Sequence, residues 1–133
     1  MHRAGARVLM TFKILVADDD QDNRDLLAFV FERSGMNLHL VTVVDGQQAI
    51  DIARDLHPHL ILMDMNMGGM DGWTAVKHLK ADIDTKDIPI IAFTAFSSSE
   101  DRERAIQIGC SEFYAKPMDP EEVLALIRQF LSV

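Results

Sequence analysis

Apolar residues along the chain gather in five short runs, and each run is followed by a longer segment whose apolar positions recur every three to four residues. Short apolar runs are typical of strands that are buried on both faces of a parallel sheet. The longer segments have the spacing of helices with one buried side. The pattern therefore predicts strand–helix units. The predicted strands are Phe12–Ala17, Leu38–Val44, Leu60–Asp64, Ile88–Thr94 and Glu112–Ala115.

Residues with strong local preferences mark the ends of the predicted helices. Aspartate and serine side chains accept hydrogen bonds from the first N–H groups of a helix, and acids suit its positive N-terminus. Glycine favours the backbone conformation that ends a helix, and proline stops one. On these signals the helices run from Asp20 to Gly35, from Gly46 to Pro58, from Gly72 to Ala81, from Ser97 to Gly109 and from Asp119 onward.

Regular alternation of strands and helices indicates an α/β protein of the flavodoxin-like (βα)5 type, with a doubly wound, parallel, five-stranded sheet. The expected strand order is 2-1-3-4-5, which makes the first and third strands neighbours. A chain of 133 residues is expected to form one domain. We expect residues 12–133 to form this domain and residues 1–11 to be a disordered N-terminal extension, with Met10 as a candidate native start.

Polar side chains stand where the predicted strands end. Asp18 and Asp19 follow the first strand, Asp64 ends the third, Thr94 ends the fourth and Lys116 follows the fifth. In open α/β sheets, ligands bind at the carboxyl ends of the strands, beside the point where the strand order reverses. With the expected strand order, the three carboxylates meet in one crevice at that point.

This set of groups points to phosphoryl transfer. Carboxylates that are packed together raise one another's pKa values unless a cation compensates their charge. Hard oxygen ligands suit Mg²⁺, which binds carboxylates together with a phosphoryl oxygen. The lysine adds a fixed positive charge and the threonine hydroxyl adds a hydrogen bond, so the charge of a phosphoryl group in transfer would be neutralised. Asp64 is the expected nucleophile, which would become a mixed anhydride.

Composition narrows the function classes. Lys+Arg 13 against Asp+Glu 21 gives a net charge of −8 and a pI near 4.9, which argues against direct binding to nucleic acid or to acidic membranes. No apolar stretch reaches the length of a transmembrane helix, and no secretory signal peptide is recognisable. The single cysteine, Cys110, precludes an internal disulfide, and we expect it to be a small buried residue. The expected location is the cytoplasm.

Four motifs give the chain a family resemblance. In order they are I-L-V-A-D-D-D at 14–20, L-I-L-M-D-M-N-M-G-G-M-D-G at 60–72, I-I-A-F-T-A at 90–95 and F-Y-A-K-P at 113–117. Each motif is common alone, but their joint order and spacing resemble the receiver domain of two-component response regulators. The resemblance covers Lys13 to Val133.

The resemblance implies roles for the residues at the strand ends. Asp64 would be the phosphoacceptor. Mg²⁺ would bind the carboxylates of Asp18, Asp19 and Asp64 and the backbone carbonyl of Asn66. Lys116 would be the lysine that binds the phosphoryl group. No cofactor besides Mg²⁺ is implied.

The resemblance also implies a conformational switch. Thr94 would be the switch hydroxyl, and Phe113, three residues before the lysine, would be the aromatic switch residue. On phosphorylation the threonine would move toward a phosphoryl oxygen and the aromatic ring would turn inward. The face formed by the fourth helix, the fifth strand and the fifth helix would then change shape. A cis peptide bond is expected before Pro117.

The implied function is that of a phosphorelay receiver rather than an enzyme with a substrate of its own. The phosphoryl donor would be a histidine kinase or a histidine phosphotransfer protein. The phosphorylated form, a monomer or weak dimer, would bind a protein partner. Because no effector region follows Val133, we expect the chain to act through such a partner or to be part of a longer protein.

Two positions modify the family pattern. Gly68 stands where the family usually has proline, and glycine would loosen the loop after the phosphoacceptor and weaken the positioning of Mg²⁺. Phe96 lies two residues after Thr94, where a polar side chain in other members can help a water molecule attack the mixed anhydride. A bulky apolar side chain should impede that water, so we expect slow self-dephosphorylation.

Three other function classes are compatible with parts of the sequence. A pseudo-receiver would keep the fold as a protein-interaction module without phosphorylation. A Mg²⁺-dependent phosphohydrolase would also use an aspartate nucleophile, but one large family of such enzymes has a second acid where this chain has Asn66. A flavodoxin-like flavin carrier would need a loop rich in glycine, serine and threonine, and three acids in its place would repel the flavin phosphate. Trp73 is a candidate contact for a partner if it is exposed.

Overall fold

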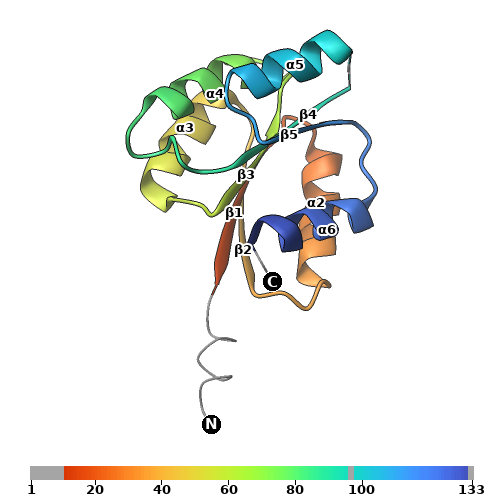
Figure 1. The fold of residues 1–133 in the computed structure, drawn as a ribbon. Coiled ribbons are helices and arrows are strands. Elements are labelled where there is room, and N and C mark those ends of the chain that lie inside the picture. Colours follow the sequence, from red (N-terminus) through yellow and green to blue (C-terminus); the bar gives the residue numbers. More distant parts are fainter. Residues whose placement is uncertain (1–10, 96–97, 132–133) are drawn as a thin grey trace.

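Ten elements alternate along the described residues, which are 11–95 and 98–131 of a computed structural model (Figure 1). The strands are β1 (Phe12–Ala17), β2 (Leu38–Val43), β3 (Leu60–Asp64), β4 (Ile90–Thr94) and β5 (Glu112–Ala115). The helices are α2 (Gln21–Glu32), α3 (Gly46–Leu56), α4 (Gly72–Ala81), α5 (Ser99–Gln107) and α6 (Pro120–Leu131). The strand–helix units predicted from the apolar pattern are confirmed.

All five strands are parallel, and they lie side by side in the order β2-β1-β3-β4-β5. The predicted flavodoxin-like fold is therefore confirmed. β1 and β3 are direct neighbours, with Ala17 opposite Met63, so the residues that follow the two strands leave the sheet at the same edge. β4 lies on the other side of β3, with Phe93 opposite Asp64, and β5 completes that side of the sheet.

Helices cover both faces of the sheet, with α3, α4 and α5 on one face and α2 and α6 on the other (Figure 1). Successive side chains of a strand point to opposite faces. In β1, Leu15 and Ala17 belong to the core beneath α3 and α4, whereas Ile14 and Val16 belong to the core beneath α2 and α6. β3 is buried along its whole length. Burial on both faces explains why these strands are continuous apolar runs rather than alternating ones.

Aspartate or serine side chains cap four of the helices at their N-termini. Each cap accepts a hydrogen bond from a backbone N–H in the first turn and so satisfies one of the helix donors that has no partner within the helix. The caps are Asp20 for α2, Asp45 for α3, Asp71 for α4 and Ser98 for α5. The third aspartate of the 18–20 run therefore has a structural role, which distinguishes it from Asp18 and Asp19.

β4 begins at Ile90, two residues later than the sequence predicted. The two residues before it belong to the preceding turn, in which the Ile88 N–H donates to the Thr85 carbonyl oxygen at 3.1 Å. Pro89 has no N–H with which to join the ladder of strand hydrogen bonds. An apolar run can therefore start before the strand that it predicts.

α2 ends at Glu32 rather than at Gly35. The Phe31 carbonyl oxygen accepts hydrogen bonds from both the backbone N–H of Ser34, at 3.2 Å, and its hydroxyl, at 2.7 Å, in place of the next helical N–H. β2 also ends one residue early, at Val43. The N-terminal extension expected at residues 1–11 lies, except for Thr11, outside the described residues.

Cys110 is buried just after α5, as expected, and burial raises the pKa of its thiol to about 11. A thiol with so high a pKa is protonated at neutral pH and is a poor nucleophile. No helix among the described residues is long and apolar enough to span a membrane.

Candidate active site

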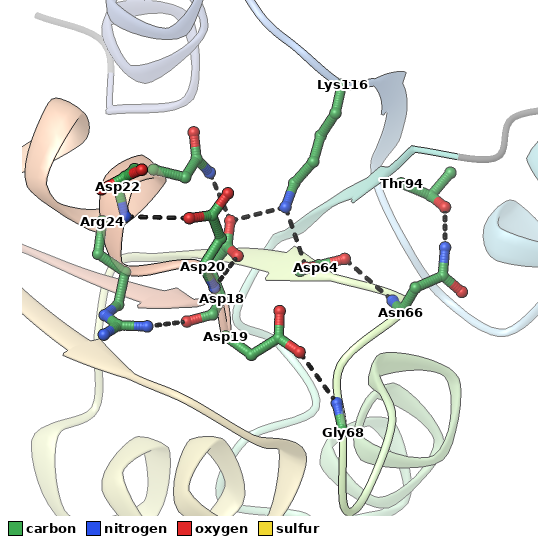
Figure 2. A network of polar contacts seen from close by, with 11 residues as sticks. Asp18, Asp19, Asp20, Asp22, Arg24, Asp64, Asn66, Gly68, Thr94 and Lys116 are labelled. Atoms are coloured by element: carbon green, nitrogen blue, oxygen red, sulfur yellow. Dashed lines mark hydrogen bonds and ion pairs between the residues drawn. The ribbon is translucent and has the colours of Figure 1, made fainter.

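Four strand ends bring polar side chains together at the carboxyl edge of the sheet (Figure 2). Asp18 follows β1, Asp64 is the last residue of β3, Thr94 is the last residue of β4 and Lys116 follows β5. Asp18, Asp64 and Thr94 are buried, with 1%, 4% and 1% of their surface exposed. The fold therefore assembles the group of side chains that the sequence placed at the strand ends.

Lys116 bridges the two buried carboxylates. Its Nζ lies 2.8 Å from Asp18 Oδ2 and 3.0 Å from Asp64 Oδ2. The peptide bond between Lys116 and Pro117 is cis, as the resemblance implied. One ammonium group thus faces two carboxylates that β1 and β3 bring side by side, and the site keeps an excess of negative charge.

Asp18 is held by more donors than the sequence suggested. Besides the lysine, its carboxylate accepts hydrogen bonds from the backbone N–H of Asp20, at 2.9 Å, and from the side-chain amide of Asn23. Arg24 Nη1 donates to the backbone carbonyl of Asp18 at 2.8 Å. Asn23 and Arg24 both lie near the start of α2, so this helix fixes the side chain and the main chain of Asp18 together.

Asn66 joins the ends of β3 and β4. Its backbone N–H donates to Asp64 Oδ1 at 2.9 Å, and its side-chain amide donates to the Thr94 hydroxyl. The resemblance gave Asn66 a contact with Mg²⁺ through its backbone carbonyl, and that role stays a prediction. The side-chain contact was not foreseen, and it links the expected phosphoacceptor to the expected switch hydroxyl through one residue.

Burial raises the pKa of the Asp64 carboxyl above its usual value, and the negative charge of Asp18 acts in the same direction. The backbone N–H of Asn66 and the Lys116 ammonium lower that pKa in part. For Lys116, burial lowers the pKa, but hydrogen bonds and charge interactions with the two carboxylates raise it more, so the net direction is upward. Lys116 is therefore charged at neutral pH.

Three carboxylates in this cluster fit a metal ion. Oxygen atoms of Asp18, Asp19 and Asp64 lie within 4.8 Å of one another, and Asp19 is exposed while the other two are buried. Carboxylate oxygens are hard ligands that suit Mg²⁺, which also keeps several water ligands. The donor set and the open side at Asp19 therefore fit the Mg²⁺ expected from the sequence.

Comparison with known proteins identifies the family. The model of the response regulator receiver domain matches residues 14–128 of the chain. The chain belongs to the response regulator receiver family. The polar-differentiation response regulator DivK of Brucella ovis is 34% identical over 123 residues, which make up 92% of this chain and 98% of that protein. The receiver is thus a signalling protein of two-component systems.

Solved structures agree with this family. A receiver domain of a sensor histidine kinase from Pseudomonas aeruginosa, with a magnesium ion coordinated in its active-site cleft, is 27% identical with a TM-score of 0.82 and covers 93% of this chain and 100% of its own. The chemotaxis protein CheY4 of Vibrio cholerae is 26% identical with a TM-score of 0.81 and covers 91% of this chain and 99% of its own.

The loop between β3 and α4 of the receiver packs tightly against its neighbours at two glycines. A Cβ atom on Gly72 would lie 2.4 Å from the Asp64 carbonyl oxygen, and one on Gly46 would lie 2.7 Å from the Met70 carbonyl oxygen. The Gly46 N–H donates to that same Met70 oxygen at 2.8 Å. The missing side chains let α3 and α4 approach the loop, which steadies the segment that carries Asn66.

Replacing Gly72 with alanine is expected to destabilise the receiver by about 2 kcal/mol or more, because the new methyl group would overlap backbone atoms rather than a movable side chain. The free energy of unfolding, measured by urea denaturation, checks this expectation. Gly68→Ala is the matched control in the same loop, since a Cβ there meets no atom within 4 Å. Equal losses of stability in the two variants would contradict the expectation.

Phe113 lies inside the receiver, with 3% of its surface exposed. It stands on β5 opposite Ala92, two residues before Thr94 on β4. Its backbone carbonyl accepts a hydrogen bond from Arg102 Nη1 at 3.1 Å. It also lines a groove of about 260 Å³ together with Ser98, Ser99, Arg102 and Ala115. The ring is already turned inward here, and its role as a switch residue stays a prediction.

Trp73 is not freely exposed. Its ring is half-buried against the core, and the guanidinium carbon of Arg104 on α5 lies 4.1 Å from the ring centroid. A cation–π contact of this kind contributes about 0.5–1 kcal/mol at an exposed site. Trp73 therefore joins α4 to α5. The hypothesis that it contacts a partner depended on an exposed ring, so it loses its basis.

Proposed function

We propose that this receiver accepts a phosphoryl group on Asp64 from the phosphohistidine of a histidine kinase or a histidine phosphotransfer protein, with Mg²⁺ bound, and that it then changes its affinity for a protein partner. The observation that carries this proposal is the position of Lys116 Nζ, within 3.0 Å of Asp64 Oδ2 and 2.8 Å of Asp18 Oδ2. A lysine in that position faces any phosphoryl group that arrives on Asp64.

In the proposed reaction an oxygen of the Asp64 carboxylate attacks the phosphorus atom. The bond between phosphorus and the donor imidazole nitrogen breaks, and the nitrogen keeps the electron pair. The backbone N–H of Asn66 holds Asp64 Oδ1 during the attack. Lys116 Nζ, which contacts Asp64 Oδ2 before the reaction, then contacts a phosphoryl oxygen. Bound Mg²⁺ supplies further positive charge to the phosphoryl oxygens.

Thr94 is the proposed link from the site to the surface. Its hydroxyl accepts a hydrogen bond from Asn66 before phosphorylation and would donate one to a phosphoryl oxygen afterwards. Thr94 is paired with Ala115 of β5, the strand that carries Phe113, and along the chain α5 follows β4 and α6 follows β5. We therefore propose that the face formed by α5, β5 and α6 binds the partner, with the receiver as a monomer or weak dimer.

The alternatives have less support from the site. Burying the charged groups of Asp18, Asp64 and Lys116 costs folding free energy, and a pseudo-receiver would have no chemical use for them. In one large family of phosphohydrolases the residue two positions after the nucleophile is a general acid, but the side chain of Asn66 has no ionisable group for that role and donates a hydrogen bond to Thr94. A flavin phosphate would meet the excess negative charge of the acidic cluster.

Two further parts of the proposal depend on the sequence alone. The net charge of −8 favours a receiver that binds neither nucleic acid nor acidic membranes directly, and the single cysteine favours a reducing compartment, for which we propose the cytoplasm. Slow self-dephosphorylation, the one reaction besides phosphoryl uptake that we propose for the receiver, depends on Phe96, which lies outside the described residues.

Transfer from acetyl phosphate tests the proposal. The intact receiver is incubated with acetyl phosphate and Mg²⁺, and its mass is then measured by mass spectrometry. We expect the addition of one phosphoryl group per chain, and none after EDTA has removed the Mg²⁺. If the receiver binds Mg²⁺ and yet stays unmodified, the phosphoacceptor proposal fails and the pseudo-receiver alternative takes its place.

A further inference from the structure

Gly68 donates a hydrogen bond that proline could not make. It lies in the loop between β3 and α4, and its backbone nitrogen lies 3.2 Å from Asp19 Oδ2 (Figure 2). The family that the sequence resembles usually has proline here, and proline has no backbone N–H. The glycine therefore adds a contact to the acidic cluster that the usual residue would remove.

Conformational freedom does not explain this glycine. The next residue, Gly69, has a φ of +68°, which disfavours any side chain. Gly68 lies outside that region of backbone conformation, and a Cβ on it would meet no atom within 4 Å. Alanine would fit at position 68 and would keep the N–H group that proline lacks.

The two acids that follow β1 are held very differently. Asp18 is buried, and its carboxylate accepts hydrogen bonds from three separate donors. Asp19 is exposed, and within residues 11–95 and 98–131 the one hydrogen bond to its side chain comes from Gly68. An exposed carboxylate without that bond would populate several rotamers, and some of them would point its oxygens away from Asp18 and Asp64.

We propose that the backbone N–H of Gly68 positions the Mg²⁺ site by orienting the Asp19 carboxylate toward Asp18 and Asp64. A carboxylate has enough lone pairs to accept this bond and to coordinate a cation as well. Carboxylates that bind metals are held by such outer hydrogen bonds in other proteins. The inference rests on the Mg²⁺ role proposed above, and it reverses the effect that the sequence suggested, since the glycine aids the site.

The loop is anchored well enough to hold Asp19 in place. The Gly46 N–H donates to the Met70 carbonyl oxygen at 2.8 Å, which ties the loop to the start of α3. The Gly72 N–H donates to the Met65 carbonyl oxygen at 3.3 Å, which joins the two ends of the loop. The Gly68 N–H therefore projects from a braced loop.

The Mg²⁺ affinities of Gly68→Pro and Gly68→Ala are compared in order to separate the effect of losing the N–H group from the effect of adding a side chain. Alanine keeps the N–H and proline removes it. In titrations of Mg²⁺ followed by calorimetry, the dissociation constant of the alanine variant should stay within about twofold of wild type, and that of the proline variant should be about tenfold higher. Thermal unfolding of both variants checks that they are folded. Equal affinities of the two variants would overturn the inference.

An Asp19→Ala background tests whether the effect passes through Asp19. In that background, proline and alanine at position 68 should bind Mg²⁺ equally weakly. A proline effect of the same size in both backgrounds would mean that proline acts on the loop itself, and the inference would be wrong. A wild-type receiver that binds no Mg²⁺ would overturn the proposed function as well, so the two failures are distinguishable.

Amide hydrogen exchange provides a test that needs no proline variant. In folded Asp19→Ala, the Gly68 amide should exchange about threefold faster than in wild type, because it has lost its acceptor. The Gly46 amide, which donates to Met70, is the internal control and should be unchanged. Unchanged exchange at Gly68 would overturn the inference.

Discussion

Asp64→Asn is expected to abolish phosphoryl uptake from acetyl phosphate and to raise the melting temperature of the Mg²⁺-free receiver at neutral pH by about 3 °C. Uptake is lost because an amide oxygen is too weak a nucleophile to form the bond to phosphorus. Stability rises because asparagine has nearly the shape of aspartate but brings no negative charge into a buried site beside Asp18. Intact-mass measurement and thermal unfolding report the two effects separately.

The stability effect should depend on pH in a defined direction. Burial raises the pKa of Asp64 in the folded receiver from a usual value of 3.8. A carboxyl with a higher pKa in the folded state binds its proton more tightly there, so the free energy of unfolding falls as pH rises through the interval between the two pKa values. The advantage of the asparagine variant should therefore be full above that interval and vanish below pH 3.8.

Asp55→Asn is the matched control, since Asp55 is an exposed aspartate on α3. It should change neither uptake nor stability. Uptake that persists in Asp64→Asn would contradict the assignment of the phosphoacceptor. A lower melting temperature at neutral pH would show that the attraction of Lys116 for Asp64 outweighs the cost of burying the carboxylate.

Lys116→Met is expected to slow phosphoryl uptake by about 100-fold at saturating Mg²⁺, because it removes a preorganised positive charge from the place where phosphoryl oxygens gather charge. Mg²⁺ binding should persist, since the carboxylates remain. The variant should also be less stable without Mg²⁺ by about 3 kcal/mol, because two buried carboxylates lose their counter-charge. The rate of mass increase with acetyl phosphate measures the first effect and urea denaturation the second.

Lys77→Met provides the control for Lys116→Met, since Lys77 is an exposed lysine on α4 and should tolerate the change. Lys116→Arg should not restore the wild-type rate, because a planar guanidinium cannot take the place of a compact ammonium between two carboxylates. The raised pKa of Lys116 means that its stabilising charge is fully present below its usual value of 10.5 and is lost as pH rises through the folded value. An uptake rate within threefold of wild type would contradict the role of Lys116.

The proximity of residues at the ends of neighbouring strands could be predicted from the sequence, because it follows from the strand order. Once the strand order is 2-1-3-4-5, a residue directly after β1 and one at the end of β3 must be neighbours, whatever their side chains do. Asp18 and Asp64 are residues of this kind. Lys116 follows β5, which β4 separates from β3, and its Nζ reaches the two carboxylates through a long side chain. The cis bond before Pro117 came from the family resemblance and was also correct.

The contacts around these strand ends could not be predicted in the same way. The side-chain amide of Asn23 donates to Asp18, and that of Asn66 donates to Thr94. Both contacts depend on how the helix and the loop pack and on side-chain rotamers. Neither property leaves a periodic signal in the sequence. The N–H of Gly68 belongs to a residue without a side chain, so its hydrogen bond to Asp19 could not be expected from the sequence.

Trp73 gives the receiver a built-in optical signal. It is the one tryptophan of the 133-residue chain, and its ring lies against Arg104 of α5 rather than in open water. The emission of an indole ring changes with nearby charge and with contact with solvent. A movement of α5 that takes Arg104 away from the ring is therefore expected to change the fluorescence of the protein, and the helix can be followed without an attached dye or an introduced residue.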